Sequence, residues 1–392
     1  RRLGGPGGEA PAAPDAGAPP AGEWRAAWIS YIELQGMDYT SAEAFRAGAA
    51  AMMDRCAGLG LNTVIVQVRP FGDALYPSAL FPWSHICTGV QGVSPGFDPL
   101  DILLTEAHSR GLSFEGWINP YRLQASASSP GTLAADNLAN THPDWVAAAG
   151  GGLYLNPAIP EAAAYVVEGV AELVRTYPVD GVHFDDYFYP TTDPAIDAAR
   201  FAASGAADLA EWRRQNVTAL VKAAHDAVKA ADPTLRFGVS PQGNPDNDMS
   251  QQYSDVRGWL AAGSEDAVVD YLCPQLYWGY GYTLSNGSRR FAYENILAEW
   301  LAMPRGSAAL YVGLGAYRIG EGDGGSNGDS VSGWSTGRAL ADQVGTLRAA
   351  GAGGYALYRY GSLFQNTAWP QLAEAECAAL TAANAPDGGR AG

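Results

Sequence analysis

The sequence predicts a (β/α)8 barrel, the TIM-barrel fold of the α/β class, with long strand-to-helix loops. Short apolar stretches that favour strands alternate along the chain with stretches of helical periodicity. Loops that follow the expected strands are long and aromatic, whereas those leading from helix to strand are short, such as 58–61 and 177–181. Active sites of this fold lie where strands lead into helices. The difference in loop length therefore predicts a functional site on the strand-to-helix side of the barrel.

The expected barrel covers residues 23–383. Residues 1–22 are rich in Gly, Pro and Ala and are expected to form a disordered linker, and 384–392 a disordered tail. The barrel strands are expected at 25–33, 62–70, 112–120, 180–190, 236–241, 270–278, 309–317 and 354–360.

Helical patterns separate these strands. Ser41 is the expected N-cap of the first helix, whose apolar face carries Phe45, Met52 and Met53. A doubly wound open sheet is the alternative fold. Gly313 and Gly315, however, continue into a tyrosine and an arginine rather than a phosphate-binding pattern. Helices are expected at 41–58, 98–111, 160–176, 207–231, 255–262, 291–303, 335–350 and 371–382.

Composition narrows the function. The formal net charge of −17 argues against nucleic-acid binding. The 11 Trp and 20 Tyr suit clefts that bind sugars, although cores also use aromatic residues. The four cysteines form no C-x-x-C pair, so neither a zinc site nor another cofactor is expected. No apolar run is long enough to span a membrane. Because the sequence starts at Arg1 rather than Met, we expect an upstream targeting segment or lipid anchor and a secreted or surface-anchored protein.

The stretch 180–190 is the centre of the functional prediction. It begins as a buried strand and ends in two adjacent acids, Asp185 and Asp186, among aromatic residues. By strand alternation His183, Asp185 and Tyr187 share one face. Two neighbouring carboxylates repel each other, and burial raises their pKa. A solvated turn is the simple interpretation. The aromatic surroundings favour a catalytic Asp185 at the mouth of the barrel.

Amides and aromatic rings gather at the other expected strand ends, with few lysines among them. Amide and carboxylate groups bind sugar hydroxyls, and rings stack on the C–H faces of sugars. The expected partner is therefore a polysaccharide. The candidate substrate-binding residues are Arg69, Trp117, Asn119, Tyr121, His183, Tyr187, Gln275, Tyr277 and Trp278.

Glycoside hydrolysis needs two carboxyl groups with different roles. Asp185 suits the ionised role if His183 or Arg69 lies beside it. The general acid stays open between Glu33, Asp186 and Asp246. Glu115 is a weaker candidate because it lies several residues below the expected rim.

Two other functions remain open. A non-catalytic glycan-binding barrel would keep the aromatic residues and survive the loss of both acids. A metal-dependent barrel hydrolase would use Asp185, Asp186 and His183 as ligands, but it would need another histidine at a strand end. A serine hydrolase is unsupported, because the chain has no G-x-S-x-G motif.

Five segments carry a family resemblance: 24–30, 62–69, 116–122, 180–190 and 274–278. They resemble the glycosyl-hydrolase-like family that is often labelled family-10-like. The resemblance implies a TIM-barrel glycosidase of the bacterial cell envelope that acts on peptidoglycan glycan strands lacking stem peptides. The strand-four motif is also similar to that of α-amylase-type barrels, which implies a catalytic Asp185 with His183 in the place of the preceding basic residue. The chain departs from these patterns at Glu115, where family members often have histidine. It departs again at 240–243, which lack the acid that amylase-type barrels have there.

Overall fold

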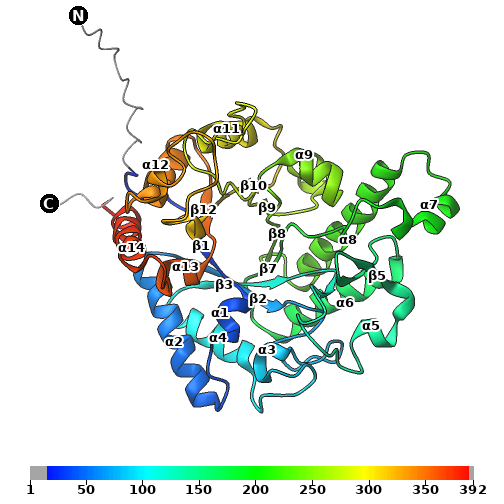
Figure 1. Ribbon diagram of the computed structural model, residues 1–392. Coiled ribbons are helices and arrows are strands. Elements are labelled where there is room, and N and C mark those ends of the chain that lie inside the picture. Colours follow the sequence, from blue (N-terminus) through cyan, green and yellow to red (C-terminus); the bar gives the residue numbers. More distant parts are fainter. Residues whose placement is uncertain (1–15, 388–392) are drawn as a thin grey trace, which may run out of the picture.

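The computed structural model describes residues 16–387, so the predictions for residues 1–15 of the linker and 388–392 of the tail lie outside the described residues. A ring of parallel strands forms the centre of the molecule, and helices surround it (Figure 1). The predicted (β/α)8 barrel is confirmed. Its strands are β1 (Trp24–Ile29), β2 (Thr63–Arg69), β3 (Ser113–Ile118), β7 (Gly181–Phe184), β8 (Arg236–Val239), β9 (Tyr271–Leu272), β10 (Ala309–Leu310), β11 (Val312–Leu314) and β12 (Gly354–Leu357).

The sheet closes on itself through an interrupted strand. The strand order is β10-β9-β8-β7-β3-β2-β1-β12-β11, and the barrel pairs are parallel. The two ends of this order, β10 and β11, flank the single residue Tyr311. They are two halves of one stretch of chain, and together they complete the ring.

Long helices pack around the ring. Ser41 is the N-cap of α2 as predicted, and its hydroxyl accepts a hydrogen bond from the Ala44 amide at 3.0 Å. Within residues 16–387, no helix combines the length and apolar character needed to cross a membrane. The long helices are α2 (Ala42–Gly58), α4 (Pro99–His108), α6 (Pro160–Thr176), α8 (Leu209–Ala231), α11 (Tyr293–Ala302), α12 (Ala339–Ala349) and α14 (Pro370–Asn384). The shorter ones are α1 (Tyr31–Gln35), α3 (His85–Thr88), α5 (Leu138–Thr141), α7 (Ala198–Ser204), α9 (Pro245–Asn247), α10 (Val256–Ala261) and α13 (Tyr360–Phe364).

A second, small sheet stands where the sequence predicts a long loop. It is antiparallel, in the order β4 (Arg122–Gln124), β6 (Gly152–Leu155) and β5 (Val146–Ala149). Gly150 and Gly151 join β5 to β6 with φ angles of 55° and 81°, a left-handed conformation that glycine adopts without steric cost. These strands have three or four residues each, too short for a clear alternating pattern.

Aromatic residues fill the interior of the ring. Trp24, Trp28, Trp117, Tyr271 and Tyr311 belong to one buried cluster inside the barrel. The outer faces of the strands pack against the helices in a separate, larger cluster. On β1, for example, Ala26 and Trp28 belong to the inner cluster and Ala27 and Ile29 to the outer one, as strand alternation requires.

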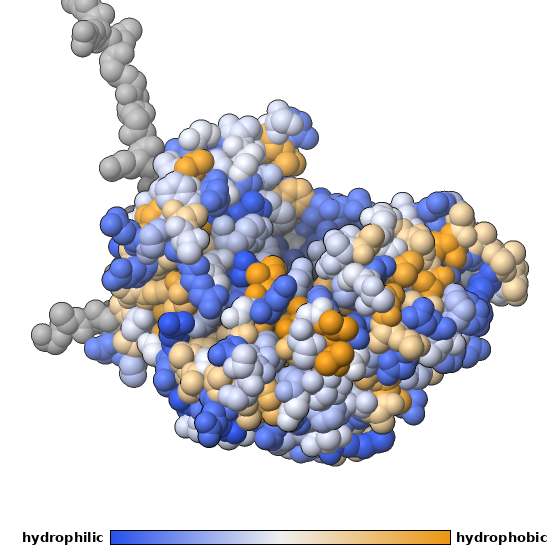
Figure 2. All heavy atoms as spheres, turned by 60° about the horizontal axis from the view of Figure 1, so that its bottom comes forward, coloured by the Kyte–Doolittle hydropathy of each residue, from blue (hydrophilic) through white to orange (hydrophobic). Residues whose placement is uncertain are grey.

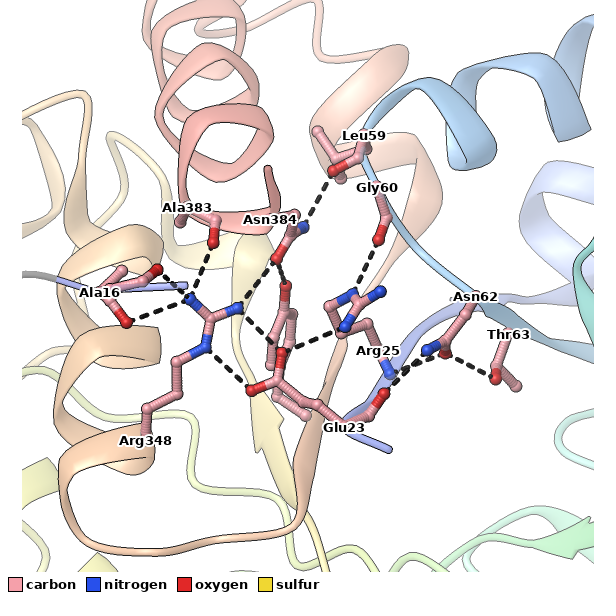
Figure 3. A network of polar contacts seen from close by, with 12 residues as sticks. Ala16, Glu23, Arg25, Leu59, Gly60, Asn62, Thr63, Arg348, Ala383 and Asn384 are labelled. Carbon is pink, nitrogen blue, oxygen red and sulfur yellow. Dashed lines mark hydrogen bonds and ion pairs between the residues drawn. The ribbon is translucent and has the colours of Figure 1, made fainter. Parts of the chain in front are cut away.

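A buried arginine joins the two ends of the described chain (Figure 3). Arg348 of α12 forms an ion pair of 2.8 Å with Glu23, which directly precedes β1. Its Nη1 also donates to the carbonyls of Ala16 and Gly17 at 3.2 Å and to that of Ala383 at 2.8 Å. The network therefore includes residues 16 and 17 of the expected linker, and Asn384 of the expected tail is buried and still belongs to α14.

Candidate active site

A pocket of about 230 Å3 opens at the carboxyl ends of the barrel strands. Figure 2 shows one face of the molecule with a hollow near its middle, bordered by hydrophilic and hydrophobic residues. Every barrel strand except β2 and β10 contributes to the pocket, either from its own last residues or from the loop that follows. The lining residues are Trp28, Trp117, Asp185, Asp186, Tyr187, Ser240, Gln275, Tyr277, Tyr317 and Tyr358.

Asp185 directly follows β7, as the sequence predicts. Two side chains from the end of the neighbouring strand β3 donate hydrogen bonds to it. Trp117 donates its indole N–H to Oδ2 at 3.1 Å, and Asn119 donates its side-chain amide to the same oxygen. The backbone amide of Tyr187 approaches Oδ1 at 3.3 Å. The side chain is 5% exposed. These donors favour the ionised carboxylate.

A hydrogen-bond chain sets the orientation of the Asn119 amide. Its Oδ1 accepts from Gln67 Nε2 at 2.5 Å and from Arg122 Nη2 at 3.2 Å. Gln67 is oriented in turn, because its Oε1 accepts from the Tyr31 backbone amide at 2.7 Å. With its oxygen occupied by two donors, Asn119 must present its nitrogen to Asp185. Gln67 and Arg122 thus support the site through Asn119.

Asp186 also faces the pocket and is 8% exposed. Gln275 Nε2 donates to its Oδ1 at 3.0 Å. The same nitrogen lies 3.1 Å from the carbonyl oxygen of Ser240, which anchors it to the end of β8. Gln275 therefore binds one acid of the pair while Asn119 and Trp117 bind the other.

Burial and mutual repulsion perturb the two acids. Burial and, after it, the neighbouring Asp186 raise the pKa of Asp185 to about 7, against the pull of Arg122 and Trp117. Burial likewise raises the pKa of Asp186, while hydrogen bonds from Gln275 and Gln242 lower it. The pair titrates as a unit and retains one proton up to about neutral pH.

Aromatic rings form most of the remaining walls. Tyr277 stacks on Tyr358 with ring centroids 5.5 Å apart, and Tyr317 meets Tyr277 edge-on at the same distance. Tyr187 is 54% exposed at the edge of the pocket, where it is free to contact a bound molecule. Rings on several sides with acids and amides between them suit a sugar ring.

The expected position of Glu33 at a strand end is wrong. β1 stops at Ile29, and Ser30 caps helix α1, in which Glu33 is the third residue of a capping box. Its carboxylate accepts from Arg359 at 2.7 Å and from the backbone amides of Ser30 and Gly361 at 2.9 Å each. Glu33 does not line the pocket, and its hydrogen bonds give it a structural role.

Arg69, one of the two residues expected beside Asp185, does not lie there. A bulge shifts the register of β2 against β3, so that Gln67 pairs with Trp117 but Arg69 pairs with Ile118. Arg69 consequently points outward. Its guanidinium lies 3.6 Å from the centre of the Phe81 ring, and Gly169 of α6 leaves room for it.

His183 lies inside the barrel, but below the pocket lining rather than against Asp185. Trp28 donates its indole N–H to His183 Nε2 at 3.1 Å, so the ring proton must be on Nδ1, which lies 2.8 Å from the Tyr271 hydroxyl. Tyr271 in turn donates to both oxygens of Glu115 at 3.1 Å. Burial lowers the pKa of His183 to about 3. The histidine is therefore neutral and supports Trp28.

Three further sequence candidates lie outside the pocket lining. Tyr121 is buried, and its ring lies 6.5 Å from that of Phe188. Trp278 packs on Phe291 at 5.1 Å. Asp246 lies at the surface, where it pairs with Arg290 at 2.5 Å. Trp117, Asn119, Tyr187, Gln275 and Tyr277 do meet the acid pair or the pocket around it.

Trp28 and Tyr358 line the pocket but were not among the residues that the sequence gathers at the expected strand ends. Gln67, Ser240 and Tyr317 were among them; Ser240 and Tyr317 line the pocket, and Gln67 orients Asn119. Each lies on a barrel strand or within a few residues after one, which is the signal that could have found them. The described residues contain no cluster of three or more His, Cys, Asp or Glu side chains that could hold a metal ion.

The fold and the pocket define a glycoside-hydrolase-like TIM barrel, and solved structures agree on the fold. An α-L-fucosidase, isoenzyme 2 from Paenibacillus thiaminolyticus, matches with a TM-score of 0.57 and 17% identity over 91% of this chain and 49% of its own. The catalytic domain of a β-amylase from Paenibacillus polymyxa matches with a TM-score of 0.53 and 11% identity. The match covers 88% of this chain and 94% of that domain.

The chain belongs to the family Glycosyl hydrolase-like 10, whose model matches residues 23–327. It is 38% identical over 323 residues to the glycosyl hydrolase YngK of Bacillus subtilis, a match that covers 76% of this chain and 61% of that protein. It is 36% identical over 299 residues to the glycosyl hydrolase DigH of Escherichia coli K12, a match that covers 69% of this chain and 65% of that protein. The chain thus spans less than two thirds of the length of either relative. The expected family is confirmed.

Proposed function

We propose that this protein hydrolyses glycosidic bonds in a bacterial cell-envelope polysaccharide, namely peptidoglycan glycan strands that lack stem peptides. The observation that carries the proposal is the pair Asp185 and Asp186, buried side by side in a pocket with aromatic walls at the carboxyl ends of the barrel strands. Membership of a glycosyl-hydrolase-like family supports the reaction class. The choice of glycan, and action at the cell envelope, rest on the resemblance of the motifs.

The hydrogen bonds support a separate role for each acid. Asp185 accepts from Trp117 and Asn119 and stays ionised, so it stabilises the positive charge that develops on the sugar in the transition state. Asp186 holds the proton of the pair and delivers it to the departing glycosidic oxygen as general acid. Glu33 and Asp246 take no part, because their carboxylates are bound elsewhere.

The test is the release of soluble glycan fragments from peptide-stripped peptidoglycan by the wild type, Asp185→Asn and Asp186→Asn. Circular dichroism checks folding. Glu265→Gln serves as a matched control, because Glu265 is an exposed acid remote from the pocket lining. We expect the wild type and the control to release fragments and both folded pocket variants to lose nearly all activity.

Two results would count against the proposal. If the folded pocket variants cut as fast as the wild type, the site is wrong. If the wild type binds the strands without cutting them, the protein is a glycan-binding barrel or acts on another glycan.

A further inference from the structure

The two acids approach the pocket from the same side. They are consecutive residues, so their Cα atoms are about 3.8 Å apart, and both follow β7. The rest of the lining consists of tryptophan, tyrosine, Ser240 and Gln275. Among the described residues that line the pocket there is no third carboxyl group to face this pair from the opposite wall.

This arrangement differs from the usual geometry of glycosidases. A carboxylate nucleophile and a general acid flank the scissile bond, with the sugar between them, about 5–5.5 Å apart for retention and about 6.5–9.5 Å for inversion. A pair on one wall cannot place a nucleophile on the far face of the ring while the acid protonates the leaving oxygen on the near face. The attacking group must then come from elsewhere, and some glycosidases take it from the substrate.

We propose that the substrate is a 2-acetamido sugar and that its own acetamido oxygen is the nucleophile, with Asp185 as the acceptor of the acetamido N–H. The inference rests on the proposed function and deepens it, since it names the sugar class that the pocket holds. Both sugars of a peptidoglycan strand carry this acetamido group, so the two proposals agree in chemistry.

The bonds made and broken balance in two steps. The acetamido oxygen attacks the anomeric carbon, the bond from that carbon to the departing oxygen breaks, and Asp186 gives its proton to that oxygen. The resulting oxazolinium ring carries positive charge, which ionised Asp185 stabilises through the N–H. A water molecule then attacks the anomeric carbon and gives a proton to Asp186, and the ring opens to restore the acetamido group. Configuration at the anomeric carbon is retained.

The contacts of Asp185 leave an oxygen for this role. Its Oδ2 is occupied by Trp117 and Asn119. Its Oδ1 has a longer contact of 3.3 Å with the Tyr187 amide and can accept a further donor. Because Trp117 and Asn119 fix the carboxylate, Oδ1 is held in place before the substrate arrives. The volume of about 230 Å3 is below the ~300–1,000 Å3 typical of drug-sized ligands and suits a single sugar ring.

The first test uses a thiazoline derived from a 2-acetamido sugar, a stable mimic of the oxazolinium ring. Its binding to the full chain is measured by calorimetry, which needs no activity. We expect it to bind the wild type and Glu265→Gln equally and to bind Asp185→Ala at least tenfold more weakly, because the charge-assisted hydrogen bond is lost. An absence of binding to the wild type would overturn the inference even if the protein cuts strands.

The second test separates the two roles that Asp185 could have. Azide is added to Asp185→Ala during digestion of peptide-stripped strands, and the anomer first released by the wild type is identified by NMR. We expect retention and no azide product. Restored turnover with a glycosyl azide of inverted configuration would make Asp185 the nucleophile, and inversion by the wild type would also overturn the inference. If the thiazoline binds but no strand is cut, the proposed peptidoglycan substrate fails while the sugar class stands.

Discussion

Asn119 presents its amide nitrogen, and not its oxygen, to Asp185, because Gln67 and Arg122 already donate to that oxygen. The carboxylate is therefore held by a side chain whose own orientation is fixed by two other side chains, Gln67 and Arg122. An amide that could rotate would offer either a donor or an acceptor to Asp185. This one offers a donor at all times.

Replacing Asn119 should therefore weaken catalysis without unfolding the chain. For Asn119→Ala we expect kcat/KM on peptide-stripped strands to fall about a hundredfold, the scale of losing a donor that is aimed at a reacting group. Steady-state kinetics measure this. Asn286→Ala is the matched control, since Asn286 lies in an exposed loop. An unchanged kcat/KM in folded Asn119→Ala would show that the amide does not act on Asp185.

The acid pair should give activity that declines above neutral pH. The pair keeps one proton while the pKa of Asp185 is raised to about 7 by burial and by Asp186, and catalysis needs that proton on one acid and a charge on the other. As the pH rises above about 7 the last proton leaves and kcat/KM falls.

The same reasoning predicts the behaviour of Asp186→Asn on an aryl glycoside of a 2-acetamido sugar whose leaving group departs without a proton. In that variant the alkaline decline should disappear, since the shared proton is no longer needed. Profiles of kcat/KM against pH for wild type and variant measure this. A decline that persists in the variant would assign the titration to another group.

Glu33→Gln should cost stability rather than catalysis. Glu33 pairs with Arg359 at 2.7 Å and accepts from two backbone amides. Loss of its charge leaves the partly buried Arg359 without its partner, and we expect the free energy of unfolding in urea to drop by about 2 kcal/mol. The kcat of the folded variant should stay within a factor of two. A drop in kcat of orders of magnitude at unchanged stability would return Glu33 to the list of general acids.

Glu115 should make the protein less stable as the pH rises. Burial raises the pKa of this carboxyl from its usual 4.5 to about 7, so the folded state binds more protons than the unfolded state between these values. The contribution of Glu115 to the free energy of unfolding is complete below about pH 4.5 and is lost as the pH rises through 7. The total loss is about 3 kcal/mol.

Glu115→Gln keeps an acceptor for the Tyr271 hydroxyl but cannot ionise. The variant should therefore lose less stability than the wild type between pH 5 and 8. Urea unfolding at both pH values measures the difference, and the exposed Glu265→Gln should behave like the wild type. Equal losses in Glu115→Gln and wild type would show that Glu115 is not the responsible group.

The fold was readable from the sequence because apolar strands and amphipathic helices alternate regularly along the chain. Asp185, Asp186 and Asn119 could be placed for the same reason, since each follows a barrel strand. Local departures from regular strands could not be read in the same way. The bulge after Gln67 turns Arg69 outward, and nothing in the residue types announces it.

Glu33 is a different case. Ser30 and Glu33 have the spacing of a capping box, which predicts a helix start and would have ended the first strand at Ile29. Trp28 was missed for a further reason. A buried tryptophan at a strand end has the same pattern whether it fills the core or lines a pocket, and the three-dimensional ring of strands decides between the two.

The network around Arg348 brings the first and last described segments of the barrel together, at the amino ends of the strands and away from the pocket. Residues 16–17 and 383–384 are thus held by one guanidinium, although hundreds of residues separate them in sequence. A circularly permuted chain, joined here by a short linker and opened in an exposed loop, would preserve every strand pairing. A protein fused near residue 16 or near residue 384 would be attached at the same place on the barrel. It would leave the mouth of the barrel accessible to a long polymer.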